Sequence, residues 1–448
     1  MPPPAHRDRD SKYTAIPMEE AEEILTNLGK QMCHKFEVVD VDLNLLGKVA
    51  GENAISTENM PRTRVSTKDG YAVVANDGAK IKAVIGVSLA GSVYNGVLQP
   101  GQCVRISTGG VVPEGASAVV MVEHTICTKS NDEGEELEIQ IKDHVSDGTN
   151  IREPGSETRK GETIVRTGTK IGSAEFGILN AFGIKNIMVY KRPIVTVIST
   201  GNEVFTNQNK LQNLKYRFQL VNLDCEEVPV GMIRDSNGPQ LVALFKEYGI
   251  DAIAGGRVSD DFECIKEKLS QSLKQSDVIV TSGGVSMGEK DNLKEVLLSL
   301  GMTIHFGRVM MKPGLPCTVA SGQIQIDGAL PTLKIVLALP GNPASAWVCS
   351  QLFAIPLVRT LSGYVKPRHT QIRVRLAEDI KLGDRPEYVR AYLEDLGNKQ
   401  CPVAHITGNQ ISSNIGSLVG AEVLLMLPMK LDGKEYVSKD ETVKAMVL

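Results

Sequence analysis

Between about residues 193 and 362, short apolar runs alternate with segments that have helical periodicity. PIVTVIST (193–200) is typical of a buried strand, and GPQLVALFKEYG (238–249) is typical of a helix. Strand–helix alternation with apolar strands predicts a parallel sheet covered by helices on both faces, which is a three-layer α/β fold. The pattern continues through CIKEKLSQSLKQ, DVIVTSGG, NLKEVLLSLG and LKIVLALPGNP to a long helix that Pro356 should kink.

Two β-rich regions flank this α/β region. From about 61 to 147, runs such as YAVVA and CVRIST are separated by glycine turns, which predicts a small β-rich subdomain. In the last region, 366–448, Ile372, Val374 and Leu376 alternate with polar neighbours, so one face of that strand is buried.

Two further helices are expected nearer the N-terminus. Residues 17–28 have an apolar face and end at Gly29, and residues 173–183 begin at a serine cap and end at a glycine. One long segment, 205–230, has no clear pattern and separates a strand from the next helix, so we interpret it as an insertion.

Composition excludes several classes of protein. The net charge of −4 offers no basic face for nucleic acid, and the apolar runs are far shorter than the roughly 20 residues of a membrane helix. The polar, proline-rich start, MPPPAHRDRDSK, is no secretory signal and predicts a disordered tail. Eight scattered cysteines without a CxxC pair argue against a zinc site or a disulfide framework, which fits a reducing cytoplasm.

Three predicted strands end in loops of unusual chemistry. These loops are ISTGNE (198–203), TSGGVSMGEKD (281–291) and ALPGNPAS (338–345). Ligands bind beyond the carboxyl ends of strands in an open parallel sheet, and glycine loops with free N–H groups bind anions. Tight turns alone would explain any single loop, but three at one sheet edge favour a phosphate or oxyanion site. Its candidates are Thr281, Ser282, Gly283, Gly284, Gly341 and Asn342.

Charged residues near these loops fit the same chemistry. Glu289 and Asp291 follow the glycines, and hard carboxylates beside phosphates usually hold magnesium. Lys312, in a Pro-Gly turn, and Arg385, in the last region, could neutralise an oxyanion. A lone lysine or arginine is usually solvated surface, so only their neighbours make these residues candidates.

Together these loops resemble the molybdopterin molybdotransferase family, which includes bacterial MoeA, the plant molybdenum-insertase E domain and gephyrin E. The sequence HFGRV…MKPGLP resembles that of animal gephyrin E most closely. The stretches that carry the resemblance are STKDGYAV (66–73), STGGVVPEGASAVVMVE (107–123), GTNIREPG (148–155), STGNE (199–203), IRDSN (233–237), TSGGVSMGEKD (281–291), HFGRVMMKPGLP (305–316), LALPGNPAS (337–345), DRPEYVR (384–390) and ITGNQISS (406–413).

The resemblance implies both an activity and an architecture. It implies magnesium-dependent transfer of molybdate to adenylylated molybdopterin, a nucleotide-containing substrate, with release of AMP. It also implies an elongated homodimer of multi-subdomain chains. The implied parts are a tail at 1–13, a linking α/β subdomain at 14–60 and 148–192, an inserted β-rich subdomain at 61–147, a MogA-like α/β subdomain at 193–365 and a C-terminal β-barrel at 366–448.

The resemblance also assigns roles to single residues. Ser286 is implied to contact the pterin phosphate or molybdate, and Asp291 to work with magnesium. Asp69 would act from the partner subunit, and the alternative is that it belongs to a structural turn, since Asp-Gly is a common turn pair. The residues implied to line the molybdate pocket are Lys312, Pro316, Ser345, Arg385 and Ser412.

Some positions depart from the family pattern. Asn414 stands where an arginine is usual, and a second arginine is missing near Val419. Asn150, Ser117 and Gly238 also differ from the usual residues. Fewer positive charges would weaken the binding of an anion, so a catalytically weakened scaffold that binds a receptor or cytoskeletal peptide is the alternative function. A third possible function is that of a protein that binds a sugar or a nucleotide through the same three loops.

The expected partners follow from the same resemblance. The sequence shows no adenylylating G domain, so we expect a separate G-domain protein to supply the adenylate if the chain is complete. We expect no membrane span and a cytoplasmic location.

Overall fold

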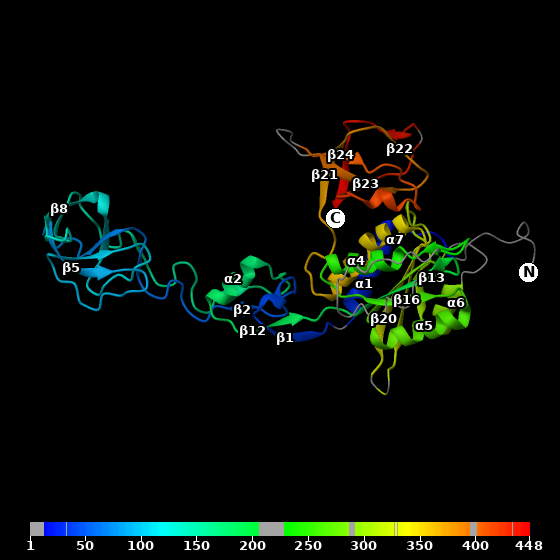
Figure 1. Ribbon diagram of the computed structural model, residues 1–448, viewed down its shortest axis with the longest axis horizontal. Helices are drawn as coiled ribbons and strands as arrows, with labels where there is room; N and C mark the ends of the chain where they lie inside the picture. The colour runs from blue at the N-terminus through cyan, green and yellow to red at the C-terminus, as the bar shows by residue number, and fades with distance from the viewer. Residues whose placement is uncertain are drawn as a thin grey trace, which may run out of the picture.

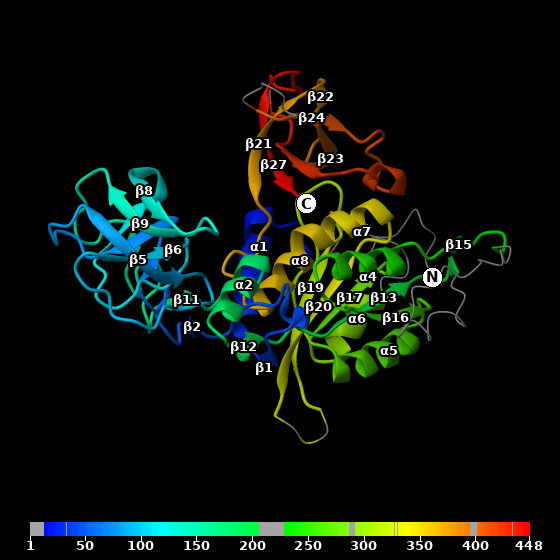
Figure 2. The ribbon, with the colours of Figure 1, turned by 60° about the vertical axis from the view of Figure 1, so that its left-hand side comes forward.

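The computed structural model describes residues 13–32, 34–205, 228–285, 292–326, 328, 330–394, 401–431 and 433–448. The chain is elongated, with a β lobe at one end, a small linking part in the middle and an α/β core at the other end (Figure 1). A β-barrel lies beside the core, and Figure 2 shows it above the helices of one core face.

The core is built on one six-stranded sheet. Its strand order is β16-β13-β17-β20-β19-β18, in which β16, β13, β17 and β20 are parallel. Strand β19 runs antiparallel to both of its neighbours, β20 and β18, so the sheet is mixed rather than wholly parallel as the alternation pattern predicted. The strands span Ile253–Val258 (β16), Val195–Thr200 (β13), Val278–Ser282 (β17), Thr332–Leu339 (β20), Thr318–Ile324 (β19) and Thr303–Phe306 (β18).

Helices cover both faces of this sheet, which confirms the three-layer prediction. Alternate residues of β17 show why: Val278 and Val280 pack with one face's helices, and Ile279 packs with the other's. One face is covered by α1 (Met18–Gln31), α4 (Asn237–Glu247), α7 (Pro343–Cys349) and α8 (Ile355–Leu361), the other by α5 (Phe262–Gln275) and α6 (Asn292–Ser299).

Two helix predictions need correction. Helix α1 does not end at Gly29 but continues to Gln31. A Cβ at Gly29 would lie 2.9 Å from Thr360 Cγ2, so this glycine allows α1 to pack closely against α8 instead of ending the helix. In α2 (Ser173–Ala181) the N-cap is Gly172, not Ser173, and the Glu175 carboxylate accepts a hydrogen bond from the Gly172 N–H.

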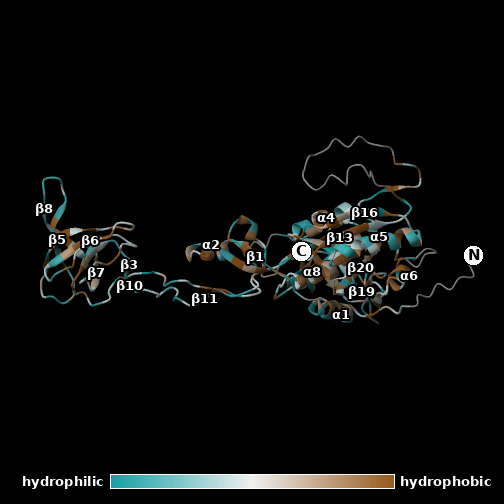
Figure 3. Cartoon of the chain, turned by 90° about the horizontal axis from the view of Figure 1, so that it is seen from below, coloured by the Kyte–Doolittle hydropathy of each residue, from teal (hydrophilic) through white to brown (hydrophobic). Residues whose placement is uncertain are grey.

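The long helix near Pro356 contains a π-helical turn, Ser350–Ala354, between α7 and α8. The Ile355 N–H bonds the Ser350 carbonyl, which widens the helix just before the proline that lacks a donor. Among the described residues, Pro343–Leu361 has the length and mean hydropathy, 1.2, of a membrane span, but 78% of it is buried. It packs in the hydrophobic core, which Figure 3 shows as brown helices and strands at the centre of the α/β part.

The linking part and the lobe are β structures built around small cores. In the linking part, β1 (Phe36–Asp40) pairs with β12 (Asn186–Tyr190), and β2 (Ala54–Ile55) pairs with β11 (Thr163–Val165). The lobe's six-stranded sheet has the order β7 (Ala118–Met121), β4 (Gly70–Val73), β6 (Gln102–Ile106), β5 (Ile81–Ser88), β9 (Glu136–Ile141) and β8 (Thr125–Ser130); β3 (Val65–Ser66) pairs with β10 (Ile151–Arg152) beside it.

The C-terminal region closes into a five-stranded barrel, as the alternating pattern led us to expect of a β subdomain. Val374 and Leu376 are fully buried inside it. The barrel order is β21 (Gln371–Leu376), β24 (Val403–Ile406), β23 (Glu387–Glu394), β25 (Val423–Leu427) and β27 (Thr442–Val447). Other short elements are the pair β14 (Val204–Phe205) with β15 (Ile233–Arg234) and the pair β22 (Ile380–Lys381) with β26 (Tyr436–Val437). The 3-10 turns are η2 (Leu43–Leu45), η3 (Val122–His124) and η5 (Ile415–Leu418).

Candidate functional site

The three strand-end loops meet at one edge of the core sheet. Strands β13, β17 and β20 are parallel neighbours, and their register aligns Ser199 with Ser282 and Ser282 with Leu339. The carboxyl ends of the three strands therefore lie side by side, as the sequence predicted. This edge is where open α/β sheets bind ligands.

Glycines allow these loops to touch. Gly283 has a φ of +96°, and a Cβ there would lie 2.5 Å from the Thr200 carbonyl oxygen. Its N–H donates to the Leu339 carbonyl at 3.0 Å, and a Cβ on Gly341 would lie 3.6 Å from the Gly283 Cα. Loop packing thus already requires glycine at position 283, whether or not a ligand approaches it.

The hydroxyls beneath the loops differ in their hydrogen bonding. The hydroxyls of Thr281 and Ser199 are buried and have no partner among the described residues. Ser282 is also buried, but its hydroxyl donates to the Pro340 carbonyl at 3.3 Å. Two buried hydroxyls with free hydrogen-bonding capacity at a strand end suit an oxygen-rich ligand.

Asn237, at the start of α4, joins two of the loops. Its Nδ2 donates to Ser282 Oγ at 2.6 Å and to the Gly341 carbonyl at 2.7 Å. The sequence reasoning quoted the IRDSN stretch but did not select this residue. The available signal was an asparagine at the first position of a helix that begins beside the sheet edge.

The first loop is held from the neighbouring strand β16. Arg257 donates to the carbonyls of Gly201 and Asn202 at 2.9 and 3.1 Å, and Asp260 accepts from the Asn202 N–H at 3.1 Å. Both residues were missed because β16 has the glycine-rich sequence IAGGRV, which does not look like a strand.

Lys312 and Arg385 come together where the barrel meets the core. The Lys312 N–H donates to the Pro386 carbonyl at 2.8 Å, and the Tyr388 N–H donates to the Lys312 carbonyl at 2.7 Å. Arg385 Nη1 donates to the Met311 carbonyl at 3.0 Å. A short backbone ladder therefore fixes two cations from different subdomains beside each other.

The Lys312 ammonium has a partner that the sequence reasoning did not select. Lys312 Nζ lies 3.0 Å from Glu387 Oε1, and the side chain of Glu387 is only 8% exposed while that of Lys312 is 46% exposed. Glu387 lies two residues after Arg385 in the DRPEYVR stretch. A buried carboxylate thus orients the ammonium and offsets part of its charge.

The barrel also reaches the start of α7. Asn342, the N-cap residue, donates from Nδ2 to Ser412 Oγ at 3.0 Å, and the Ala344 N–H donates to the Ser412 carbonyl at 3.1 Å. Ser345 is buried in the first turn of the same helix. Asn342 thus bonds the barrel instead of capping its own helix.

Helix α7 connects the glycine loops to the charged turn. Its start carries the Ser412 contact, and at its end a Cβ on Gly314 would lie only 2.3 Å from Cys349 Sγ. The helix has seven residues, so its two ends lie about 10 Å apart. Pro316 belongs to the same turn, in which the Cys317 N–H bonds the Gly314 carbonyl at 3.2 Å.

Among the described residues, Asp69 is a predicted site residue that its own chain does not bring into this cluster. Asp69 lies in the distal lobe between β3 and β4, where its carboxylate accepts from the Thr108 N–H at 2.7 Å, and this bond lowers the pKa of Asp69. Ser286, Glu289 and Asp291 lie outside the described residues, as does most of the predicted insertion at 205–230.

The departure at Asn414 has a structural role. Its Oδ1 accepts from the Gly416 N–H at 3.1 Å and its Nδ2 donates to the Asn409 carbonyl at 2.9 Å. This asparagine therefore caps η5 and shapes the loop that carries Ser412. It contributes no positive charge to the site.

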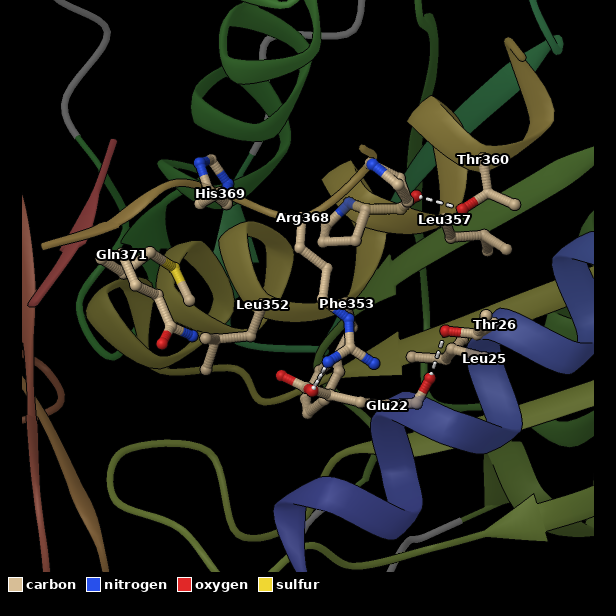
Figure 4. Close-up of a pocket in the computed structure, with 13 residues that line it drawn as sticks. Glu22, Leu25, Thr26, Leu352, Phe353, Leu357, Thr360, Arg368, His369 and Gln371 are labelled. Carbon is tan, nitrogen blue, oxygen red and sulfur yellow. Dashed lines mark hydrogen bonds and ion pairs between the residues drawn. The ribbon is translucent and has the colours of Figure 1, made fainter. Parts of the chain in front are cut away.

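A small cavity lies elsewhere, between α1, the π turn, α8 and the strand β21 (Figure 4). Arg368 and Glu22 form an ion pair at 2.5 Å within it, and burial raises the pKa of Glu22 while Arg368 opposes the rise. The cavity contains none of the residues predicted from the sequence, so we place the functional site at the strand ends instead.

Fold and site together define an elongated α/β protein whose oxyanion-type site is assembled by a three-layer core and a C-terminal barrel. Comparison of the chain with known protein families identifies this class. The MoeA N-terminal region (domain I and II) matches residues 16–183, the probable molybdopterin binding domain matches 196–360, and the MoeA C-terminal region (domain IV) matches 373–448. The chain belongs to the MoeA family, as its loops predicted.

Similar proteins come from distant organisms. A gephyrin of Dictyostelium discoideum is 34% identical over 98% of this chain and 63% of its own length, so the chain spans less than two thirds of that relative. A molybdopterin molybdenumtransferase of Nostoc is 31% identical over 97% of this chain and 95% of its own. A solved MoeA structure from Pyrococcus horikoshii has a TM-score of 0.73 at 26% identity, covering 97% of this chain and 99% of that one.

Proposed function

We propose that this chain is a molybdopterin molybdotransferase, which transfers molybdate to adenylylated molybdopterin and releases AMP. The observation that carries the proposal is that helix α7 connects the glycine loops to the two cations. Glycine loops with free hydroxyls lie at one end, and Lys312 and Arg385 lie toward the other. The names of the Nostoc and other relatives support the same reaction class.

The chemistry of the substrates fits this arrangement. Molybdate is a dianion, which lysine, arginine, hydroxyls and backbone N–H groups bind well. A phosphoanhydride-linked nucleotide needs N–H groups and hydroxyls around its phosphates. Thr281 and Ser199 supply such hydroxyls, while Lys312, Arg385 and Ser412 would hold the oxyanion. No side chain has to act as a covalent nucleophile.

Magnesium dependence is a further part of the proposal. The described residues bring no three His, Cys, Asp or Glu side chains together as a metal site, and the candidates Glu289 and Asp291 lie outside them. When bound, magnesium would neutralise charge that develops as the phosphoanhydride breaks. Removal of magnesium by chelation should stop AMP release without unfolding the chain.

We propose that the active unit is a homodimer in the cytoplasm. Asp69 lies in a lobe separated from its own core by the linking part (Figure 1). If Asp69 takes part in the reaction, it must reach the core of a second subunit. The adenylylated substrate would come from a G-domain protein.

A gephyrin-like scaffold is the second candidate function. Asn414 is the observation that favours it, because a neutral cap replaces a family arginine beside the Ser412 loop. A scaffold would bind a receptor or cytoskeletal peptide and would show no turnover.

One assay separates the two candidates. Purified protein receives adenylylated molybdopterin, molybdate and magnesium, and AMP and active cofactor are measured. Molybdate-dependent AMP release supports the transferase. An intact dimer without any turnover supports the scaffold.

A further inference from the structure

We propose that Arg390 is a positioning residue that holds the Ser412 loop, defined as residues 407–418, in the geometry that binds the oxyanion. The proposal rests on the proposed function for its oxyanion, but the loop contact itself does not. Arg390 lies on β23, touches none of the glycine loops, and was not selected from the sequence.

The guanidinium group holds one end of the loop. Arg390 is fully buried, and its Nε and Nη2 donate to Ser417 Oγ at 3.2 and 2.9 Å. The Ser417 hydroxyl in turn donates to the Asn414 carbonyl at 2.7 Å. One side chain thereby fixes η5 and the cap residue that begins it.

The backbone of Arg390 holds the other end. Thr407 donates to the Arg390 carbonyl from its N–H at 3.0 Å and from its hydroxyl at 3.1 Å. The Gln410 side chain accepts from the Arg390 N–H at 2.9 Å and donates to its carbonyl at 3.2 Å. Both ends of the loop therefore depend on a single strand residue.

Between these anchors the loop reaches the site. Ser412 accepts hydrogen bonds from Asn342 and from the Ala344 N–H at the start of α7. A shift of the loop would move the Ser412 hydroxyl relative to Lys312 and Arg385. Misplacement of a binding group by about 1 Å commonly costs up to about 100-fold in activity.

The burial of the Arg390 guanidinium is not expected to stabilise the barrel. Burial lowers the pKa of Arg390 to about 10, although nearby Glu387 opposes the change. Its Nη1 is buried without a partner among the described residues. A buried charge costs free energy unless it is paired and fully hydrogen-bonded. The hydrogen bonds to Ser417 thus serve the loop rather than the barrel.

The test combines substitutions with two readouts. Arg390→Met removes the guanidinium contact with Ser417, Arg390→Lys keeps the charge, and Ser417→Ala removes the hydroxyl that accepts from Arg390 and donates to Asn414. Arg375→Met is the matched control, since Arg375 lies on β21 of the same barrel and pairs with Asp440 at 3.4 Å. Amide hydrogen exchange of residues 407–418 and the steady-state constants for molybdate are measured for each.

We expect Arg390→Met to fold with a Tm close to wild type and to exchange the loop amides faster. We expect its KM for molybdate to rise about 10-fold while kcat changes much less. Arg390→Lys should recover part of the loss, Ser417→Ala should show the same change in smaller degree, and Arg375→Met should show none.

A folded Arg390→Met with unchanged loop exchange and unchanged KM overturns the proposal. If that variant does not fold, an unchanged Ser417→Ala overturns it instead. If the wild type has no turnover, the proposed function fails, and loop exchange alone then decides whether Arg390 positions the loop.

Discussion

Lys312 and Glu387 form an ion pair of 3.0 Å across the junction of the core and the barrel. The lysine lies in the Pro-Gly turn of the core, and the glutamate lies at the start of β23. Because the N–H and the carbonyl of Lys312 both bond the barrel, the backbone of Lys312 cannot shift without the barrel, and the ion pair with Glu387 orients its ammonium. The site therefore depends on two subdomains keeping a fixed relation.

Removal of the Lys312 charge should weaken molybdate binding. A hydrogen bond to a charged group contributes about 1.5–3 kcal/mol, so Lys312→Met should raise the Kd for molybdate about 10- to 100-fold. Isothermal titration measures this Kd. Lys430→Met is the control, since Lys430 pairs with exposed Asp384 at 2.6 Å on the barrel surface. Equal affinity of Lys312→Met and wild type would remove Lys312 from the site.

Subunit complementation tests whether Asp69 acts in the partner's site. At a molybdate concentration near the wild-type Kd, Asp69→Ala and Lys312→Met should each have little activity as homodimers. Mixed dimers would carry one site with both substitutions and one intact site, so full exchange should restore about a quarter of wild-type activity. AMP release before and after mixing measures the recovery. No recovery, with exchange demonstrated by mass spectrometry, would place Asp69 outside a shared site.

Gly283→Ala should destabilise the core beyond the cost of its backbone conformation. Its φ of +96° disfavours any side chain, and the new Cβ would lie 2.5 Å from the Thr200 carbonyl. We expect a loss of about 3 kcal/mol in the free energy of unfolding, from strain and overpacking together.

The control for this variant is Gly301→Ala. Gly301 has a φ of +73° but no atom within 4 Å of its Cβ position, so it should lose only about 1–2 kcal/mol. Urea denaturation measures both values. Equal losses in the two variants would mean that the contact between the strand-end loops is not tight.

His369 should make stability fall at acid pH. Burial, followed by the nearby charge of Arg359, lowers the pKa of His369 from 6.5 to about 4. Between pH 6.5 and pH 4, His369 is therefore protonated in the unfolded chain and neutral in the folded chain. Stability from neutral His369 is complete above pH 6.5 and falls as the pH drops toward 4, by at most about 3 kcal/mol.

Thermal unfolding between pH 7 and pH 4 checks this pH dependence. His369→Gln should flatten the fall in Tm, whereas His124→Gln, at an exposed pair with Asp143 in the distal lobe, should not. Parallel curves for wild type and His369→Gln would contradict the buried neutral imidazole.

The sequence predicted those parts of the fold that local patterns determine. The apolar strands β13, β17 and β20 and their loops were found because burial on both faces leaves a continuous apolar run. Strand β16 was missed because glycines replace most of its side chains. The reversed direction of β19 was missed because no local pattern distinguishes an antiparallel strand from a parallel one.

The site was predicted where glycine and charge mark a loop, and missed where a residue acts through position alone. Asn237, Glu387 and Arg390 occupy ordinary helix or strand positions, and only tertiary packing brings them to the loops. Gly29 shows a different error. The sequence pattern predicted that this glycine ends a helix, whereas it allows two helices to pack closely.

The most direct measurement of the central claim is molybdate-dependent AMP release by the purified chain. Wild-type protein is given adenylylated molybdopterin and magnesium, with and without molybdate, alongside Lys312→Met. We predict AMP and active cofactor only when molybdate is present, with little of either from the variant. AMP release that is equally fast in wild type and Lys312→Met, or absent from a folded dimeric wild type, would contradict the account.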